Sequence, residues 1–195
     1  MSSRAAQATR SGAGPSDAAL VVEARAGERW AQEALFRRHA PRLVGLAFRV
    51  MGRDADVDDL VQDAFVAAFT TLGRLEKPDA FASWIGGILV RQAYKLIRRR
   101  KLLARLGLRG GGEPIDLDTI VSPSASPDRA AELRAIYAAL GAMDADVRVP
   151  LVLHRVEGAS LEEVADMTGM SLATVKRRIA AADALLRARF DGGAS

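Results

Sequence analysis

Apolar residues recur at helical spacing along most of this 195-residue sequence. The pattern is clearest over residues 54–72, where apolar side chains at i, i+3, i+4 and i+7 would share one face of a helix. Gly73 is expected to end that helix, and residues 75–79 to form a loop. Residues 18–50 are expected to form two helices separated at Gly27, and residues 80–106 one long helix. No segment alternates as a strand does, so the sequence predicts an all-α fold.

Two helical blocks, residues 17–106 and 128–190, flank a segment that is rich in glycine, proline and serine. That composition disfavours both helix and strand over residues 107–127, so we expect two small helical domains joined by a flexible linker. Residues 1–16 are small and polar and lack the apolar core of a signal peptide, which predicts a disordered tail. No apolar run is long enough to cross a bilayer, so no membrane insertion is expected.

Residues 160–190 carry the signals of two helices joined by a tight turn. Ser160 and Glu163 form a capping box, in which each side chain bonds the other residue's backbone N–H. Gly169 supplies a left-handed residue at the end of the first helix, and Ser171 caps the second. The second helix has an apolar stripe formed by Val175, Ile179, Ala182 and Leu186. The small Ala165, the turn glycine and the apolar Val175 are spaced as in a helix-turn-helix.

The start of this second helix is where a recognition helix meets base edges and phosphates. The threonine could contact a base edge, and the cations could bind phosphates or guanine. The candidate DNA-binding residues are Ser171, Thr174, Lys176, Arg177 and Arg178. The alternative is a plain pair of antiparallel helices with a solvated basic face.

A second candidate nucleic-acid surface lies in residues 86–112, which contain eight cations and no acid. A solvated helix usually mixes both signs of charge, so an unmixed run indicates a polyanionic partner. Trp84 and Tyr94 lie on the same predicted helix, residues 80–106, and could stack on unpaired bases. Two alternatives stay open: the cations could simply favour a helix C-terminus, and Trp84 could belong to the core.

Negative charge is concentrated on the predicted 54–72 helix, which has no basic residue. Its aspartates are Asp54, Asp56, Asp58, Asp59 and Asp63. They suit the positive end of a helix dipole, and together they would repel DNA. Such a face could bind a basic protein surface, or it could simply be solvated.

Catalytic chemistry finds little support in the sequence. There is no cysteine, which excludes disulfides, cysteine-ligated zinc and thiol catalysis and is consistent with a cytoplasmic protein. His39 and His154 do not have metal-ligand spacing, and the glycines at 110–112 lack the Lys-Ser or Lys-Thr of a phosphate loop. We therefore expect no catalytic residue, no metal, no cofactor and no small-molecule substrate. The aspartates near Asp58 could in principle hold magnesium, which leaves a nucleic-acid-modifying enzyme as a weak alternative.

Taken in order, these segments resemble the bacterial RNA polymerase sigma factors, specifically the small extracytoplasmic-function group. Residues 58–65, Asp-Asp-Leu-Val-Gln-Asp-Ala-Phe, resemble that family's core-polymerase-binding helix. Residues 81–85, Phe-Ala-Ser-Trp-Ile, with the basic helix after them, resemble its promoter-melting segment. Residues 149–165 and 174–178 resemble its minus-thirty-five-binding domain.

The resemblance implies a sigma factor that binds core RNA polymerase, directs it to promoter DNA and helps to melt the minus-ten element. An anti-sigma factor is a further implied partner. The implied polymerase-binding residues are Asp58, Asp59, Leu60, Gln62 and Asp63. The implied minus-ten residues are Trp84, Arg91, Tyr94, Lys95, Arg98 and Arg99. A stand-alone helix-turn-helix regulator would explain the C-terminal half equally well, but neither the Asp58 motif nor the basic helix.

Several positions depart from the family's pattern. Family members often have Asn and Asp where this chain has Arg91 and Lys95, and an arginine where it has Ala82. Their loop before Phe81 also usually differs from residues 77–80 here. Ala180 and Ala181 replace basic or histidine positions that are common after the recognition turn. We therefore expect the isolated C-terminal domain to bind the minus-thirty-five element weakly.

Overall fold

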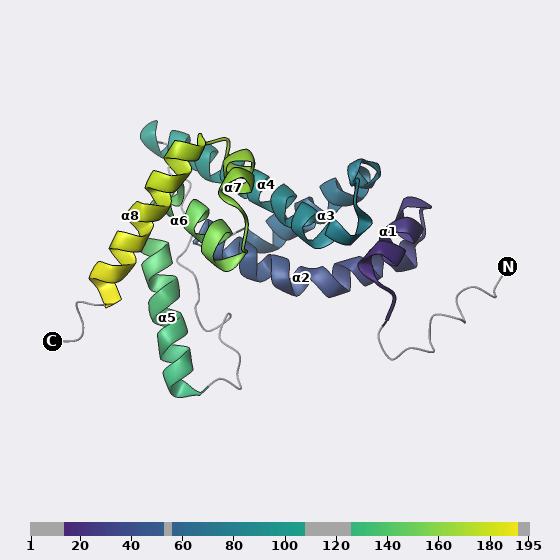
Figure 1. The fold of residues 1–195 in the computed structure, drawn as a ribbon, viewed down its shortest axis with the longest axis horizontal. Coiled ribbons are helices and arrows are strands. Elements are labelled where there is room, and N and C mark those ends of the chain that lie inside the picture. The colour runs from purple at the N-terminus through teal and green to yellow at the C-terminus, as the bar shows by residue number, and fades with distance from the viewer. Residues whose placement is uncertain (1–13, 53–55, 108–125, 191–195) are drawn as a thin grey trace.

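The computed structural model describes residues 14–52, 56–107 and 126–190, and this part of the chain contains helices and turns but no strand (Figure 1). The predicted all-α fold is confirmed. The predicted tail, apart from residues 14–16, lies outside the described residues. So does the predicted linker, apart from residues 107, 126 and 127. The α-helices are α1 (Asp17–Arg25), α2 (Arg29–Met51), α3 (Val57–Thr70), α4 (Phe81–Arg105), α5 (Pro127–Ala142), α6 (Ala145–Leu151), α7 (Leu161–Thr168) and α8 (Leu172–Phe190).

Helices α1 to α4 form the first half of the molecule. The predicted break at Gly27 is confirmed, since this glycine has a φ of 89° between α1 and α2. Ser16 caps α1 by accepting a hydrogen bond from the backbone N–H of Ala19 at 3.3 Å. Gly52 ends α2 in the left-handed conformation. Side chains from α2 and α4 fill the centre of this half, among them Leu35, Leu43, Leu46, Phe81, Ile85 and Leu89.

The segment between α3 and α4 differs from the prediction. Helix α3 ends at Thr70 rather than at Gly73, because the Thr71 hydroxyl donates to the Ala67 carbonyl at 2.7 Å and the chain tightens into the 3₁₀ turn η2 (Leu72–Arg74). Gly73 lies within that turn and has no positive φ. The expected loop contains a second 3₁₀ turn, η3 (Pro78–Ala80), which leads directly into α4.

The second half consists of α5 to α8 and a π-helical turn, η5 (Val152–Val156), that continues α6. Helix α8 packs along α6 and crosses α7. Val164 of α7 and Val175 of α8 are both fully buried at that crossing. The helix-turn-helix therefore rests on an apolar base supplied by α6.

The two halves pack against each other and share one continuous apolar core. In Figure 1, α7 lies beside α4, and α6 lies near α2. Arg148 of α6 is only 5% exposed, and its guanidinium donates to the carbonyls of Val50, Met51, Leu140 and Met143 at 2.9–3.2 Å. One cation thus satisfies the free carbonyls near the C-termini of α2 and α5.

Candidate nucleic-acid interface

The helix-turn-helix has the local geometry that its sequence predicts. The Ser160 hydroxyl accepts from the backbone N–H of Glu163 at 3.1 Å, and the Glu163 carboxylate accepts from the N–H of Ser160 at 2.8 Å. Gly169 ends α7 with a φ of 70°. Ser171 caps α8 by accepting from the N–H of Thr174 at 3.3 Å. The capping box, the glycine turn and the second cap are all confirmed.

The polar residues at the start of α8 fall into two groups. Ser171, Lys176 and Arg177 are exposed, and neither cation is in an ion pair within the described part of the chain. The Thr174 hydroxyl lies 2.9 Å from that of Ser171, so part of its hydrogen-bonding capacity is used inside the helix. Arg178 is half-buried, and its Nε has no hydrogen-bond partner among the residues that the structure describes. Lys176 and Arg177 are therefore open to phosphates, whereas Arg178 turns inward.

Helix α4 carries an exposed basic stripe. Arg91, Lys95, Arg98 and Arg99 are all exposed, at spacings of about one helical turn. Arg100, on another face, pairs with Asp56. Within the described residues none of these four cations is in an ion pair, and such a row of exposed cations is suited to follow a phosphate backbone.

The two aromatic candidates on α4 have different surroundings. Trp84 is half-buried and tilts against Phe81 at a ring-centroid distance of 6.2 Å, so it contributes to the core and keeps an accessible edge. Tyr94 is only 8% exposed, and its hydroxyl donates to the Asp146 carboxylate at 2.7 Å. The expectation that Tyr94 is open to an unpaired base is therefore wrong for this arrangement, because its ring lies between α4 and α6.

Charges around Asp146 shift two pKa values. Burial acts to raise the pKa of Asp146, but the Tyr94 hydrogen bond and the positive charges of Lys101 and Arg178 outweigh it, so the pKa lies below its usual 3.8. Burial, followed by the hydrogen bond and negative charge of Asp146, raises the pKa of Tyr94 above its ordinary value. Asp146 is thus a carboxylate and Tyr94 a neutral donor at neutral pH.

Helix α3 presents the acidic face that the sequence predicts. Asp58, Asp59, Gln62 and Asp63 are exposed at the i, i+1, i+4, i+5 positions of one face. The predicted polymerase-binding set also contains Leu60, but this residue is only 5% exposed and packs in the core. The prediction that Leu60 belongs to the exposed face is wrong, because it lies on the opposite, apolar stripe of the helix. Asp54 lies outside the described residues.

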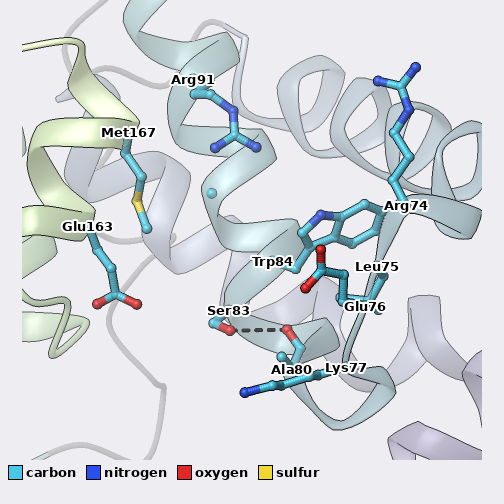
Figure 2. A pocket seen from close by; sticks show the side chains of 11 residues that line it. Arg74, Leu75, Glu76, Lys77, Ala80, Ser83, Trp84, Arg91, Glu163 and Met167 are labelled. Atoms are coloured by element: carbon cyan, nitrogen blue, oxygen red, sulfur yellow. Dashed lines mark hydrogen bonds between the residues drawn. The ribbon is translucent and has the colours of Figure 1, made fainter.

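A cleft of about 380 Å³ separates the start of α4 from α7. Figure 2 shows Arg74, Trp84 and Arg91 on one side of it, with Glu163 and Met167 of α7 on the other. In this arrangement, the first helix of the helix-turn-helix therefore lies next to the aromatic and basic residues of α4.

The described residues give no support for a metal site or a membrane-spanning segment. No group of three or more histidine, cysteine, aspartate or glutamate residues in the described ranges is placed to hold a metal ion. No helix within those ranges is long and apolar enough to cross a membrane.

Sequence reasoning missed three residues that connect the halves: Asp146, Arg148 and Glu157. A signal existed for Arg148, because it is the one cation at the start of a strongly apolar run, residues 147–153. Such a cation is either exposed on a helix edge or buried with several acceptors. Asp146 and Glu157 carried no distinguishing local pattern.

Two family models match the chain: Sigma-70 region 2 over residues 35–102 and Sigma-70 region 4 over residues 133–186. The ECF RNA polymerase sigma factor SigM of Mycobacterium tuberculosis is 32% identical over 171 residues, which cover 88% of this chain and 83% of that protein. RNA polymerase sigma factor CnrH of Cupriavidus metallidurans is 31% identical over 182 residues, which cover 90% and 94%. A third relative, ECF RNA polymerase sigma factor SigE of Mycolicibacterium smegmatis, is 30% identical over 151 residues, 75% of this chain but 56% of that protein.

Solved structures show the same architecture. CnrH in complex with the cytosolic domain of CnrY has a TM-score of 0.59 at 30% identity, and the match covers 91% of this chain and 99% of that one. The sigma factor RpoE of Bartonella quintana, solved with the anti-sigma factor NepR, has a TM-score of 0.63 at 23% identity over 82% and 96%, which supports the fold alone.

The chain belongs to the sigma-70 family of RNA polymerase sigma factors, which carry out promoter-specific initiation of transcription with bacterial RNA polymerase. Within that family its relatives place it in the extracytoplasmic-function group, and the chain itself matches region 2 and region 4.

Proposed function

We propose that this chain docks on core RNA polymerase through the acidic face of α3 and contacts promoter DNA through α4 and α8. The observation that carries this proposal is the separation of charge within one helical half. Asp58, Asp59, Gln62 and Asp63 are exposed on α3, while α4 exposes only cations along its stripe. An acidic face suits a basic protein surface, and a cationic stripe suits phosphates.

The DNA contacts would be divided between the two helices. The exposed Arg91, Lys95, Arg98 and Arg99 of α4 would hold the melted minus-ten strand, with Trp84 at the start of the stripe. Stacking of an aromatic ring on an unpaired base supports strand separation. At the start of α8, Ser171, Thr174, Lys176, Arg177 and Arg178 would meet the minus-thirty-five duplex, where a helix-turn-helix places its recognition residues.

The chemistry of RNA synthesis would belong to the polymerase, so we infer that this chain is not itself an enzyme. It would act in the cytoplasm, where transcription takes place. An anti-sigma factor is a further proposed partner, since relatives of this fold were solved with CnrY and with NepR. An N-terminal half with an acidic helix and a basic helix does not favour a stand-alone helix-turn-helix regulator, which would need no polymerase-docking face.

The test is transcription by purified core polymerase on genomic DNA fragments, with and without the chain. Discrete transcripts that require the chain would support the proposal. DNA binding without capture of core polymerase would instead support the stand-alone regulator. Metal-dependent cleavage of the fragments, abolished by Asp58→Ala, would support an enzyme.

A further inference from the structure

An arginine at the end of α1 reaches the segment between α3 and α4. Arg25 donates from its Nε to the Leu72 carbonyl at 3.2 Å, and from a terminal guanidinium nitrogen to the Leu75 carbonyl. These acceptors lie 47 and 50 residues further along the chain. In the described part of the chain, Arg25 forms no ion pair with a carboxylate. Both of its bonds are therefore to backbone, so they fix the course of a distant segment instead of balancing a charge.

The two bonded carbonyls stand at the ends of a short turn that leads into an extended stretch. The Leu72 carbonyl also accepts from the Leu75 N–H at 3.2 Å, which closes η2. The Leu75 side chain is only 4% exposed, and its backbone is extended. From there the chain continues through the exposed Glu76 and Lys77 to η3. A planar guanidinium that bonds both carbonyls therefore sets the direction in which residues 75–77 leave the core.

This segment forms one wall of the cleft beside Trp84. Its residues Arg74, Leu75, Glu76 and Lys77 line the cleft of about 380 Å³. Figure 2 shows Leu75 and Glu76 next to the Trp84 indole, with Arg74 on the same side. Trp84 is half-buried, so the placement of this wall decides how much of the ring an incoming base can reach.

Helix α1 is a firm base for the Arg25 contact. Leu20 and Val21 are fully buried, and Ser16 caps the first turn of the helix. The helix also lies along η3, next to the segment that Arg25 bonds. No residue of α1 lines the cleft, and none belongs to the acidic face of α3 or to the basic stripe of α4. Any effect of Arg25 on nucleic acid must therefore pass through residues 72–77.

We propose that Arg25 is a positioning residue for single-stranded DNA: from α1 it holds residues 72–77 as a fixed wall beside the Trp84 ring on which an unpaired base stacks. The inference rests on the proposed role of α4 in holding the melted strand, and it extends that role to a helix outside the DNA surface. Without the two bonds, the wall would adopt several positions, and the strand would bind only when the wall is in place. The affinity is then reduced by the population of that competent state.

The first experiment measures whether Arg25 fixes the wall beside Trp84. The chain has two tryptophans, so Trp30→Phe leaves Trp84 as the single tryptophan fluorophore. In that background, acrylamide quenching compares the otherwise unchanged chain with Arg25→Met and Arg38→Met. Arg38 is the matched control, because it also bonds a carbonyl, that of Pro15 at 2.7 Å, but does not line the cleft. We expect stronger quenching for Arg25→Met alone. Equal quenching of all three proteins would overturn the proposal.

The second experiment measures DNA binding of the full-length protein by fluorescence anisotropy. A fluorescein-labelled single strand of mixed sequence is compared with the duplex of the same sequence. Arg25→Met should bind the single strand about fivefold more weakly than Arg38→Met does, as expected for the loss of one net hydrogen bond. Its duplex affinity should equal that of the control, because each variant loses one positive charge and the contacts of α8 are unchanged. A general loss of fold would weaken both DNA forms together. Equal losses for the two DNA forms, or equal single-strand affinities of the two variants, would overturn the proposal.

A conservative variant separates the bonding geometry from the charge. Arg25→Lys keeps the positive charge but replaces the planar fork with a single ammonium group. It should recover only part of the single-strand affinity and only part of the protection of Trp84 from acrylamide. Full recovery of both would show that the charge alone is sufficient and would overturn the role of the paired carbonyl bonds. Circular dichroism verifies the folding of each variant, and Arg25→Lys carries both measurements if Arg25→Met unfolds the chain.

Failure of this inference can be distinguished from failure of the proposed function. If core polymerase and the chain start transcription but Arg25→Met behaves as Arg38→Met does, the inference fails alone. If Arg25→Met exposes Trp84 and weakens single-strand binding but the wild-type chain yields no transcript with core polymerase, the proposed function fails. In that case, Arg25 would position a single-strand site that serves a different nucleic-acid-binding role.

Discussion

The acidic face of α3 and the basic surfaces of α4 and α8 differ in how much of them the fold leaves accessible. Asp58, Asp59, Gln62 and Asp63 are all exposed and away from the contact between the halves. By contrast, Tyr94 and Arg178 are turned into that contact. The proposed polymerase-docking surface is thus complete in the free chain, whereas the proposed DNA-reading surface is only partly available.

The largest expected effect is on the polymerase side. Reversing two charges with Asp59→Lys and Asp63→Lys should reduce core-polymerase binding by more than about tenfold, because opposed charges at an interface are replaced by repulsion. Binding of the same protein to a DNA duplex should be unchanged or slightly tighter. Surface plasmon resonance with immobilised core polymerase measures the first quantity, and anisotropy with labelled DNA measures the second.

The matched control for that change is on α5. Asp128→Lys and Glu132→Lys also reverse two exposed acids four residues apart, so they alter the net charge equally at a different site. They should leave polymerase binding near the wild-type value. A similar loss in both double variants would mean that net charge, and not the face of α3, governs polymerase binding.

A second test concerns the cation that joins the halves. Replacing Arg148 with Met should lower the free energy of unfolding by roughly 2–4 kcal/mol, because four carbonyls lose a buried donor. Urea unfolding followed by circular dichroism measures this loss. Arg187→Met, at an exposed position in the last turn of α8, should change stability by less than about 0.5 kcal/mol. Equal effects of the two substitutions would show that the Arg148 contacts are not important for stability.

A third test separates the open from the covered cations of the recognition helix. Lys176→Ala should weaken binding to random duplex and reduce the salt slope by about one unit, as expected for one lost phosphate contact. Arg178→Ala should weaken duplex binding less than Lys176→Ala does, because the Arg178 side chain is half-buried and that of Lys176 is exposed. An equal or larger loss with Arg178→Ala would mean that Arg178 is as accessible to DNA as Lys176.

The smallest expected effect is that of pH. The Tyr94 hydrogen bond and nearby positive charges lower the pKa of Asp146 below 3.8 in the folded chain, against the effect of burial. The stabilising contribution of Asp146 is therefore complete above 3.8 and is lost as the pH falls through the folded-state pKa. The free energy of unfolding from urea titrations should show no Asp146-dependent change between about pH 5 and 8. A difference between wild type and Asp146→Asn that changes near about pH 6 would contradict this.

The sequence predicted several helix boundaries well, because these boundaries depend on neighbouring residues in the chain. The Ser160 capping box, the left-handed Gly169 and the break at Gly27 each depend on a few neighbouring residues. The one misplaced helix end, at Gly73, shows the limit of this reasoning. The hydroxyls of Thr70 and Thr71 donate to backbone carbonyls in the last turn of α3. The buried Leu72 then begins a 3₁₀ turn, so α3 ends before Gly73.

Exposure of the site residues was predicted less well, because it depends on contacts between distant segments. The opposite faces of α3 follow from helical periodicity, although Leu60 was grouped with its exposed neighbours. The position of the Tyr94 side chain depends on Asp146, which is 52 residues away in the sequence. Helical spacing fixes the face of a residue on its own helix, but not which other helix will cover that face. Contacts between the halves therefore had to come from the structure.

The central claim is that this chain confers promoter specificity on RNA polymerase. Its most direct test is run-off transcription from genomic fragments with core polymerase, using wild type and the Asp59→Lys, Asp63→Lys double variant in parallel. The account predicts discrete transcripts with wild type, strong loss with the α3 variant, and retained transcription with the α5 control. Wild-type protein that neither captures core polymerase nor yields any transcript would contradict it.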